Sequence, residues 1–365
     1  MKKKSISVIA FAVSALLILT SFVGCNPENG GDNGNGTSQT TDTTENVNTD
    51  NENTEGTETT ENSDTTENSD TTENSDTTEN NGGNNDDDTS EKLYKREGDY
   101  IYFGSYPQTL KADDVRVSRD ADENGRYLGS DGYYYVKVMA DPYTSGYRFS
   151  TGLSVTDGFV YYFKIEPIRW RILTEKDGKA MLLCDSILNN QKYDADPQLS
   201  ASVSNNYAES DVRKWLNETF YDTAFGGLEK ELIQITEVDN NLASTGMSKN
   251  ENVCQNTNDK LFLLSFVEAT NPEYGFVAES SKTGETRAED PARMIKATDY
   301  ALAMGECVST SEDYYGCGWW WLRTPENGGS TQTGYSVDLV LASGMIMFST
   351  VHDSCAVVPA MWITL

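Results

Sequence analysis

Histidine is almost absent from this chain of 365 residues, in which His352 is the only one. A zinc site that needs two or three imidazoles is therefore excluded, and so is a mechanism that uses a pair of histidines. The chain also lacks a phosphate-binding P-loop, a dinucleotide-binding glycine motif and a nucleophile elbow. The sequence thus predicts no catalytic residue and favours a protein that is not an enzyme.

Cysteine is scarce as well, and no C-x-x-C pair is present among the six cysteines. Five of them follow Cys25, so at least one thiol is free or pairs elsewhere if the protein is exported. Cys307 and Cys317 are the favoured disulfide because they lie ten positions apart across a predicted helix-to-strand connection. Five buried thiols remain the alternative, because apolar neighbours such as those of Cys184 suit a core residue.

Basic residues are missing from residues 26–90, which also contain no aromatic side chain and 18 Asp or Glu. The hexapeptide TTENSD occurs at 59–64, 65–70 and 71–76. Because no apolar surface can be buried, nothing offsets the entropy lost on ordering, and we expect a disordered tether. A flexible coil of this length spans roughly 45 Å root-mean-square.

The first 25 residues have the pattern of a secretory signal. Three lysines at positions 2–4 precede a short apolar run from about Val8 to Leu19, which is too short to span a membrane. The ending Val23-Gly24-Cys25 resembles the lipobox of bacterial lipoproteins, in which the cysteine receives lipid after cleavage, although Phe22 departs from that pattern. We expect export and a lipid anchor on Cys25 that holds the protein to the cell membrane, with an ordinary signal or uncleaved anchor as the alternative.

The remaining residues, 91–365, carry a formal net charge of −15 out of −30 for the chain. No basic stripe is visible that could neutralise phosphates, so nucleic acid is excluded as a partner. A solvated acidic surface accounts for the excess, and binding of a cation is the alternative.

Residues 91–365 are long enough for one globular domain, and short alternating segments predict an α+β fold of short antiparallel strands with a few helices. Strands are predicted at 100–104, 133–138, 159–165, 168–173 and 180–184, with a hairpin turn at 177–178. Helices are predicted at 210–226, 228–235 and 290–305. The caps at Ser210 and Asp290 mark the first and third helix starts.

Several blocks in order resemble an uncharacterised domain family of bacterial surface lipoproteins. They are Phe103 to Gln108 (FGSYPQ), Pro167 to Leu173 (PIRWRIL), Val212 to Asn217 (VRKWLN), Leu261 to Ser265, Ala297 to Ala301, Trp320 to Arg323 (WWLR) and Val358 to Trp362. Val358 stands where the family usually has arginine. The tryptophan-rich strand and the Pro-x-x-Trp ending are similar, more distantly, to C-type-lectin-like domains, including the formylglycine-generating type. The resemblance implies an architecture but no activity and no catalytic residue.

One segment matches a calcium-loop pattern, D-x-D-x-N-G. Its candidate ligands are Asp120, Asp122, Asn124 and Asp131. The converging oxygens would suit calcium, the only cofactor that the sequence suggests. A polar hairpin turn explains the same residues, because both flanks look like strands.

The segment GCGWWWLRTP at 316–325 holds three adjacent tryptophans. Trp320 to Arg323 lie within the family block and are predicted to be buried, so Trp319 is the one candidate for an exposed ligand-binding platform. Together the patterns predict a lipid-anchored cell-surface protein with a non-catalytic domain that binds an extracellular carbohydrate or protein. An exported enzyme acting on cell-wall or environmental polymers is the alternative.

Overall fold

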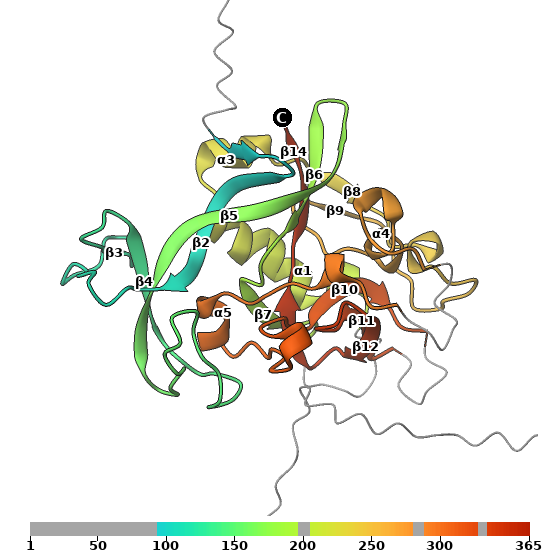
Figure 1. The fold of residues 1–365 in the computed structure, drawn as a ribbon. Coiled ribbons are helices and arrows are strands. Elements are labelled where there is room, and N and C mark those ends of the chain that lie inside the picture. Colours follow the sequence, from blue (N-terminus) through green and yellow to red (C-terminus); the bar gives the residue numbers. More distant parts are fainter. Residues whose placement is uncertain (1–92, 196–204, 280–287, 328–333) are drawn as a thin grey trace, which may run out of the picture. The chain divides into compact units, whose positions relative to one another are not determined.

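Two sheets of mostly antiparallel strands form the frame of the folded part (Figure 1). The computed structural model describes residues 93–195, 205–279, 288–327 and 334–365. The predicted signal peptide with Cys25 and the predicted tether at 26–90 lie outside these residues. Short helices accompany the sheets, so the predicted α+β fold with antiparallel strands is confirmed.

The first sheet has seven strands arranged around the long strand β5. Its strands are β1 (Lys95–Glu97), β2 (Tyr100–Leu110), β3 (Tyr127–Leu128), β4 (Tyr134–Met139), β5 (Val160–Lys176), β6 (Lys179–Cys184) and β14 (Ala360–Thr364). One edge of β5 pairs with β2, which in turn pairs with β1. The other edge pairs with β4 at one end and β6 at the other, and these continue to β3 and β14 respectively.

Strand β5 runs through Pro167, where the sequence predicts a break between two strands. β4 pairs with residues 160–164 and β6 with residues 170–176, so a gap on that edge of β5 surrounds the proline. Proline has no N–H to donate, and this gap is the edge position at which a sheet tolerates it. The hairpin turn predicted at 177–178 is present, with positive φ at both Asp177 and Gly178.

The second sheet has five strands, in the order β12-β11-β10-β13-β7. Their bounds are β7 (Asn189–Lys192), β10 (Trp320–Pro325), β11 (Ser336–Val340), β12 (Ile346–Thr350) and β13 (Ser354–Val357). Only β10 and β13 are parallel. All six residues of β10 are buried, which confirms that Trp320 to Arg323 belong to the core. A separate short pair is formed by β8 (Thr236–Val238) and β9 (Thr257–Asp259).

One helical segment packs against both sheets. It comprises α1 (Asp211–Trp215), a π-helical turn (Leu216–Phe220) and α2 (Tyr221–Ala224), which confirms the predicted helix at 210–226. Ser210 caps it by accepting the Arg213 N–H. α2 contacts β2 of the first sheet, and α1 contacts β7 of the second. The helices α3 (Gly227–Leu232) and α4 (Phe266–Ala269) are short. Across the described ranges, no helix has the length and hydropathy of a membrane span.

The single helix predicted at 290–305 is wrong. A 3-10 turn (Pro291–Arg293) ends at once, an extended stretch follows, and α5 (Asp299–Ala303) begins anew behind the cap Thr298. The guanidinium of Arg293 is fully buried and donates to the carbonyls of Gly344 and Ala269. These tertiary bonds fix the chain in a direction that a continuing helix could not take.

Two apolar cores lie beneath the sheets. The larger joins both sheets around residues such as Trp170, Trp320 and Trp321. The smaller lies under β4 and the first part of β5, where Phe149, Tyr161 and Phe163 meet α5. We call residues 127–165, which contain β3, β4, the loop after β4 and the start of β5, the arm; it projects at one end of the first sheet (Figure 1).

Candidate functional site

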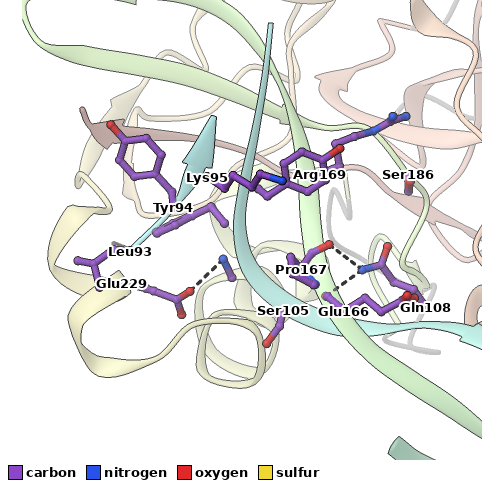
Figure 2. Close-up of a pocket in the computed structure, with 13 residues that line it drawn as sticks. Leu93, Tyr94, Lys95, Ser105, Gln108, Glu166, Pro167, Arg169, Ser186 and Glu229 are labelled. Atoms are coloured by element: carbon purple, nitrogen blue, oxygen red, sulfur yellow. Dashed lines mark hydrogen bonds between the residues drawn. The ribbon is translucent and has the colours of Figure 1, made fainter. Parts of the chain in front are cut away.

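One pocket lies where two β-bulges interrupt the pairing of β2 with β5, and we call it the bulge pocket (Figure 2). Its volume is about 760 Å³. Residues that line it include Lys95, Gly104, Gln108, Glu166, Arg169 and Glu229. The family block 103–108 therefore forms part of its wall, in the stretch where the register shifts. Bulges are common beside functional sites, which makes this pocket a first candidate.

Gly104 makes the first bulge, where the sequence predicts the strand to end in a turn. Its φ is +65°, and an added Cβ would lie 2.5 Å from the Phe225 ring and 2.8 Å from the Ala224 carbonyl oxygen. Its N–H donates to Glu229 Oε1 (3.1 Å), while Glu229 Oε2 accepts the Gly226 N–H (2.6 Å). The glycine and the carboxylate thus join β2 to the start of α3. Gly104 and the Glu229 carboxylate therefore have a structural role.

The cations of the bulge pocket already have acidic partners. Lys95 Nζ lies 2.5 Å from Glu97 Oε1. Arg169 pairs with Asp185, and its guanidinium carbon also lies 4.8 Å from the ring centroid of Tyr100. A ligand that used either charge would have to compete with these contacts, so we regard the bulge pocket as the weaker candidate.

A second pocket, the arm pocket, lies between the arm and the segment around α5 and is lined by both. Its volume is about 620 Å³, within the usual range for small-molecule sites. Its polar lining comes from Arg148 and Ser150 of the arm, Lys296 just before α5, Asp299 at the start of α5, and Thr310 and Tyr315 of the following loop. The pocket therefore joins the arm to two neighbouring segments that lie far later in the sequence.

Hydrogen bonds hold the walls of the arm pocket in place. The buried carboxylate of Asp299 accepts the Ser150 N–H (2.6 Å), the Ser150 hydroxyl (2.7 Å) and the Leu110 N–H (3.0 Å). The Tyr147 hydroxyl bonds both the N–H and the carbonyl oxygen of Val308 (2.9 Å each). The arm loop is consequently attached to α5 and to the loop after it, so the protein's own hydrogen bonds hold the walls of the pocket.

Arg148 and Lys296 are cations of the arm pocket that have no ion-pair partner in the described parts of the chain. Arg148 Nη1 donates to the Gly152 carbonyl oxygen (2.9 Å), which fixes one end of its guanidinium. The Tyr315 side chain, 56% exposed, borders the same pocket. The arm pocket therefore holds two cations without an ion-pair partner among the described residues, against the one carboxylate of Asp299, beside an accessible aromatic ring.

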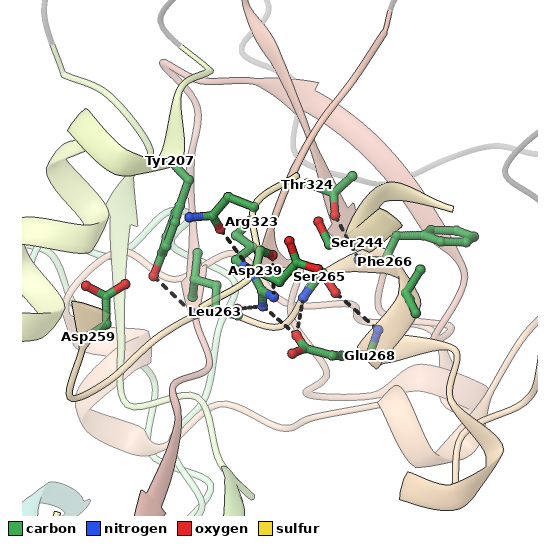
Figure 3. Close-up of polar contacts among 12 residues, drawn as sticks. Tyr207, Asp239, Ser244, Asp259, Leu263, Ser265, Phe266, Glu268, Arg323 and Thr324 are labelled. Carbon is green, nitrogen blue, oxygen red and sulfur yellow. Dashed lines mark hydrogen bonds and ion pairs between the residues drawn. The ribbon is translucent and has the colours of Figure 1, made fainter. Parts of the chain in front are cut away.

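The arginine of the WWLR block serves a different purpose (Figure 3). Arg323 is 2% exposed and donates to Asn240 Oδ1 (3.2 Å), the Leu263 carbonyl (2.6 Å), the Asp239 carbonyl (3.0 Å) and the Glu268 carboxylate. The N–H donors of its guanidinium are occupied by acceptors within the protein, so few donors are left to bind a ligand. Arg323 therefore connects β10 to the segments before α4 and after β8.

The sequence predicts four calcium ligands: Asp120, Asp122, Asn124 and Asp131. In the structure, Asp122 Oδ1 accepts the Arg126 N–H (2.8 Å) and Oδ2 accepts Arg126 Nε–H (2.9 Å). Asp131 Oδ2 accepts the Tyr135 hydroxyl (2.7 Å). No group of three or more His, Cys, Asp or Glu side chains that could hold a metal is found in the described ranges, so these aspartates do not converge. The segment is a tight turn, and calcium binding stays a prediction that isothermal titration tests.

The predicted disulfide between Cys307 and Cys317 is not formed, because Cys317 is a free, buried thiol. Val308 pairs antiparallel with Gly318, which places Cys317 opposite Ser309. Cys307 is then its diagonal neighbour, at a typical Cα separation of about 7–8 Å, beyond the ~4.4–6.8 Å that a disulfide spans.

Trp319 is half-buried and packs against the main core, so it is a smaller platform than the sequence predicts. We expect Trp319→Ala to lower the free energy of unfolding by about 2 kcal/mol, less than the ~3–5 kcal/mol of a fully buried indole. Chemical denaturation of the full-length chain measures it, with the exposed Tyr143→Ala as a control that should change little. A Trp319 variant as stable as the control would show that the indole is a surface residue.

Glu306 is a buried acid outside both pockets, 1% exposed, and its Oε2 has no hydrogen-bond partner in the described residues. Burial raises the pKa of its carboxyl well above the usual 4.5. Above pH 4.5 the unfolded chain loses this proton, while the folded chain keeps it up to its own higher pKa. The free energy of unfolding therefore falls as the pH rises toward the folded-state pKa.

Glu306→Gln removes this titration, and we expect its stability relative to the wild type to increase steadily above about pH 4.5. Thermal melts between pH 4 and 8 measure the effect, and a difference of 1 kcal/mol corresponds to about 2–4 °C. The exposed Glu312→Gln is the matched control. Parallel pH curves for Glu306→Gln and wild type would contradict the assignment.

A family model described as a domain of unknown function (DUF6273) matches residues 177–365. The match covers more than half of the chain, which therefore belongs to this family. No curated protein matches the chain, and no solved structure matches it. The arm and the family blocks at 103–108 and 167–173 lie before the matched residues.

Sequence reasoning missed the arm pocket. Neither Arg148 nor Lys296 stands in a motif, and Asp299 appears only as part of the family block 297–301. The available signal was weak: two basic residues near tyrosine and glycine in an acidic domain.

Proposed function

We propose that this is a lipid-anchored cell-surface protein whose folded part recognises an extracellular ligand, a carbohydrate or a protein. The lipobox-like ending at Cys25 and the acidic repeats at 26–90 support the anchor and the tether. The arm is then the part that makes contact. A C-type-lectin-like architecture is part of this proposal and rests on the sequence resemblance alone.

The observation that carries the proposal is where exposed apolar side chains gather. Eight of the sixteen large apolar residues that are exposed lie between positions 128 and 160, within the arm. Met139 is 68% exposed and Phe159 is 61% exposed. Single exposed apolar residues are ordinary, but a concentration of them on one element is typical of a binding surface.

Two of the arm's tyrosines are held in position by cations. Lys164 Nζ lies 3.3 Å from the ring centroid of Tyr133, and the Arg126 guanidinium carbon lies 4.7 Å from that of Tyr134. Tyr133 is 48% exposed and Tyr134 is 41% exposed. Cation–π contact orders the rings before a ligand arrives, which lowers the entropic cost of stacking on a sugar face. This favours carbohydrate over protein.

A glycan array probed with the full-length protein tests the proposal. We expect binding to a defined set of glycans, weakened about tenfold by Tyr133→Ala or Tyr134→Ala. Ile235→Ala is the matched control, since Ile235 is 71% exposed but lies outside the arm. Arm variants that bind as well as the control would exclude the arm as the contact surface, and a protein ligand would appear as arm-dependent binding to purified envelope proteins.

Incubation of each bound glycan with the protein separates recognition from catalysis. Recognition predicts that the glycan is recovered intact. Depletion of the glycan would instead support the alternative, an exported enzyme that acts on cell-wall or environmental polymers.

The lipid anchor has its own test. Cells that express the chain are fed a clickable palmitate analogue, and we expect label on the wild type and none on Cys25→Ser, which should be released from the membrane fraction. Equal membrane retention without label would identify an uncleaved anchor instead.

A further inference from the structure

We propose that the arm pocket binds an acidic saccharide and that a sugar carboxylate pairs with Arg148 and Lys296. The inference rests on the proposed recognition function and names the ligand class for it. It depends on three observations: the unpaired cations, the accessible ring and hydroxyls beside them, and the walls that are already formed.

The charge of the arm pocket indicates an anionic ligand. Residues 91–365 carry a net charge of −15, so acidic partners are plentiful. Lys95 and Arg169 of the bulge pocket have such partners, whereas Arg148 and Lys296 have none among the residues that the structure describes. The one carboxylate that lines the pocket, Asp299, is held by three hydrogen bonds from neutral donors, so two cations face a single negative charge there.

The guanidinium of Arg148 is arranged to receive a carboxylate. Its Nη1 is bound to the Gly152 carbonyl oxygen (2.9 Å), which leaves Nε and Nη2 without a protein acceptor in the described ranges. A planar guanidinium binds the two oxygens of a carboxylate more specifically than a single ammonium does. Lys296, which lines the same pocket from the segment just before α5, supplies a second positive charge.

The rest of the lining suits a sugar ring. Tyr315 is 56% exposed and presents an aromatic ring at the pocket. Ser309 and Thr310 add hydroxyl groups, which both donate and accept. An aromatic ring beside such groups can stack on the apolar face of a sugar while its hydroxyls are hydrogen-bonded.

Titration calorimetry of the full-length protein tests this with two probes, a galacturonic-acid trisaccharide and the neutral galactose trisaccharide. We expect the acidic probe to bind at least about tenfold more tightly, and added salt to reduce that preference. Arg148→Gln with Lys296→Gln should remove the preference. Tyr315→Ala should weaken both probes alike.

Arg169→Gln in the bulge pocket and Ile235→Ala, exposed but outside the arm, are the matched controls, and neither should alter the preference. Equal affinity for the two probes, or a preference that survives in the double variant, would overturn the inference while leaving recognition by the arm intact. Failure of both probes to bind would overturn it too. Failure of every glycan and envelope protein on the arrays is what would refute the broader recognition function.

Discussion

Arg323→Met is expected to lower the free energy of unfolding by about 3–5 kcal/mol, the cost of breaking a buried ion pair from one side. The substitution leaves the Asp239 and Leu263 carbonyls and the Asn240 side chain without their donor. Burial works to raise the pKa of the Glu268 carboxyl, but the charge and hydrogen bond of Arg323 outweigh it and hold that pKa below 4.5.

The stability that ionised Glu268 contributes through its pair with Arg323 is present above the unfolded-state pKa of this carboxyl. It is lost as the pH falls through the lower folded-state pKa. We therefore expect the Arg323→Met deficit to be largest near neutral pH and to shrink in acid. Guanidinium denaturation of the full-length chain at several pH values measures it, with unchanged m-values as the sign of an intact fold.

Arg169→Met is the matched control for Arg323→Met, because Arg169 also pairs with a carboxylate, that of Asp185, but is exposed. Its expected cost is at most about 1 kcal/mol. Arg323→Lys keeps the charge but not the planar set of donors, so its deficit should lie between the two. Equal deficits for Arg323→Met and Arg169→Met would contradict the structural role of the buried guanidinium.

Gly344→Ala is expected to be the most damaging change at any glycine. The φ of Gly344 is +79°, and an added Cβ would lie 2.0 Å from the Asp290 carbonyl oxygen. The Gly344 carbonyl also accepts Arg293 Nε–H (2.7 Å), so relief of the clash would disturb a buried arginine. Strain at positive φ alone costs about 1–2 kcal/mol, and the steric conflict adds to it.

Gly275→Ala separates the two contributions. Gly275 has nearly the same φ, +82°, but nothing lies within 4 Å of its added Cβ. We expect a loss of about 1 kcal/mol for Gly275→Ala and at least about 3 kcal/mol for Gly344→Ala by chemical denaturation. Similar losses would mean that the loop at Asp290 moves aside freely.

Local signals predicted a good share of the fold. The helix behind Ser210 was found because its cap and its apolar stripe lie within a few residues of each other. The hairpin at 177–178 was found because Asp177-Gly178 is a typical two-residue turn between two strand segments. The long helix at 290–305 was wrong because burial of Arg293 and pairing of Lys296 with Cys317 depend on segments far away in sequence.

The candidate site was harder to predict than the fold. Arg148 and Lys296 meet at one pocket only because Asp299 holds the arm loop through Ser150, and that contact joins residues 149 positions apart. Nothing in the local sequence of either cation indicates that it lacks an acidic partner. The exposed aromatic residues of the arm, by contrast, were visible as tyrosine clusters whose burial only the structure could decide.

The pairing of β14 with β6 has a consequence for how the chain reaches its native state. Residues 360–364 pair with residues 179–183, and the whole second sheet lies between them in sequence. Such distant pairing slows folding, because a long loop must close before its contacts form. If the chain is exported as we propose, the first sheet cannot be completed until the final strand has crossed the membrane. If the chain crosses unfolded, the order of its strands therefore delays completion of the first sheet until translocation ends.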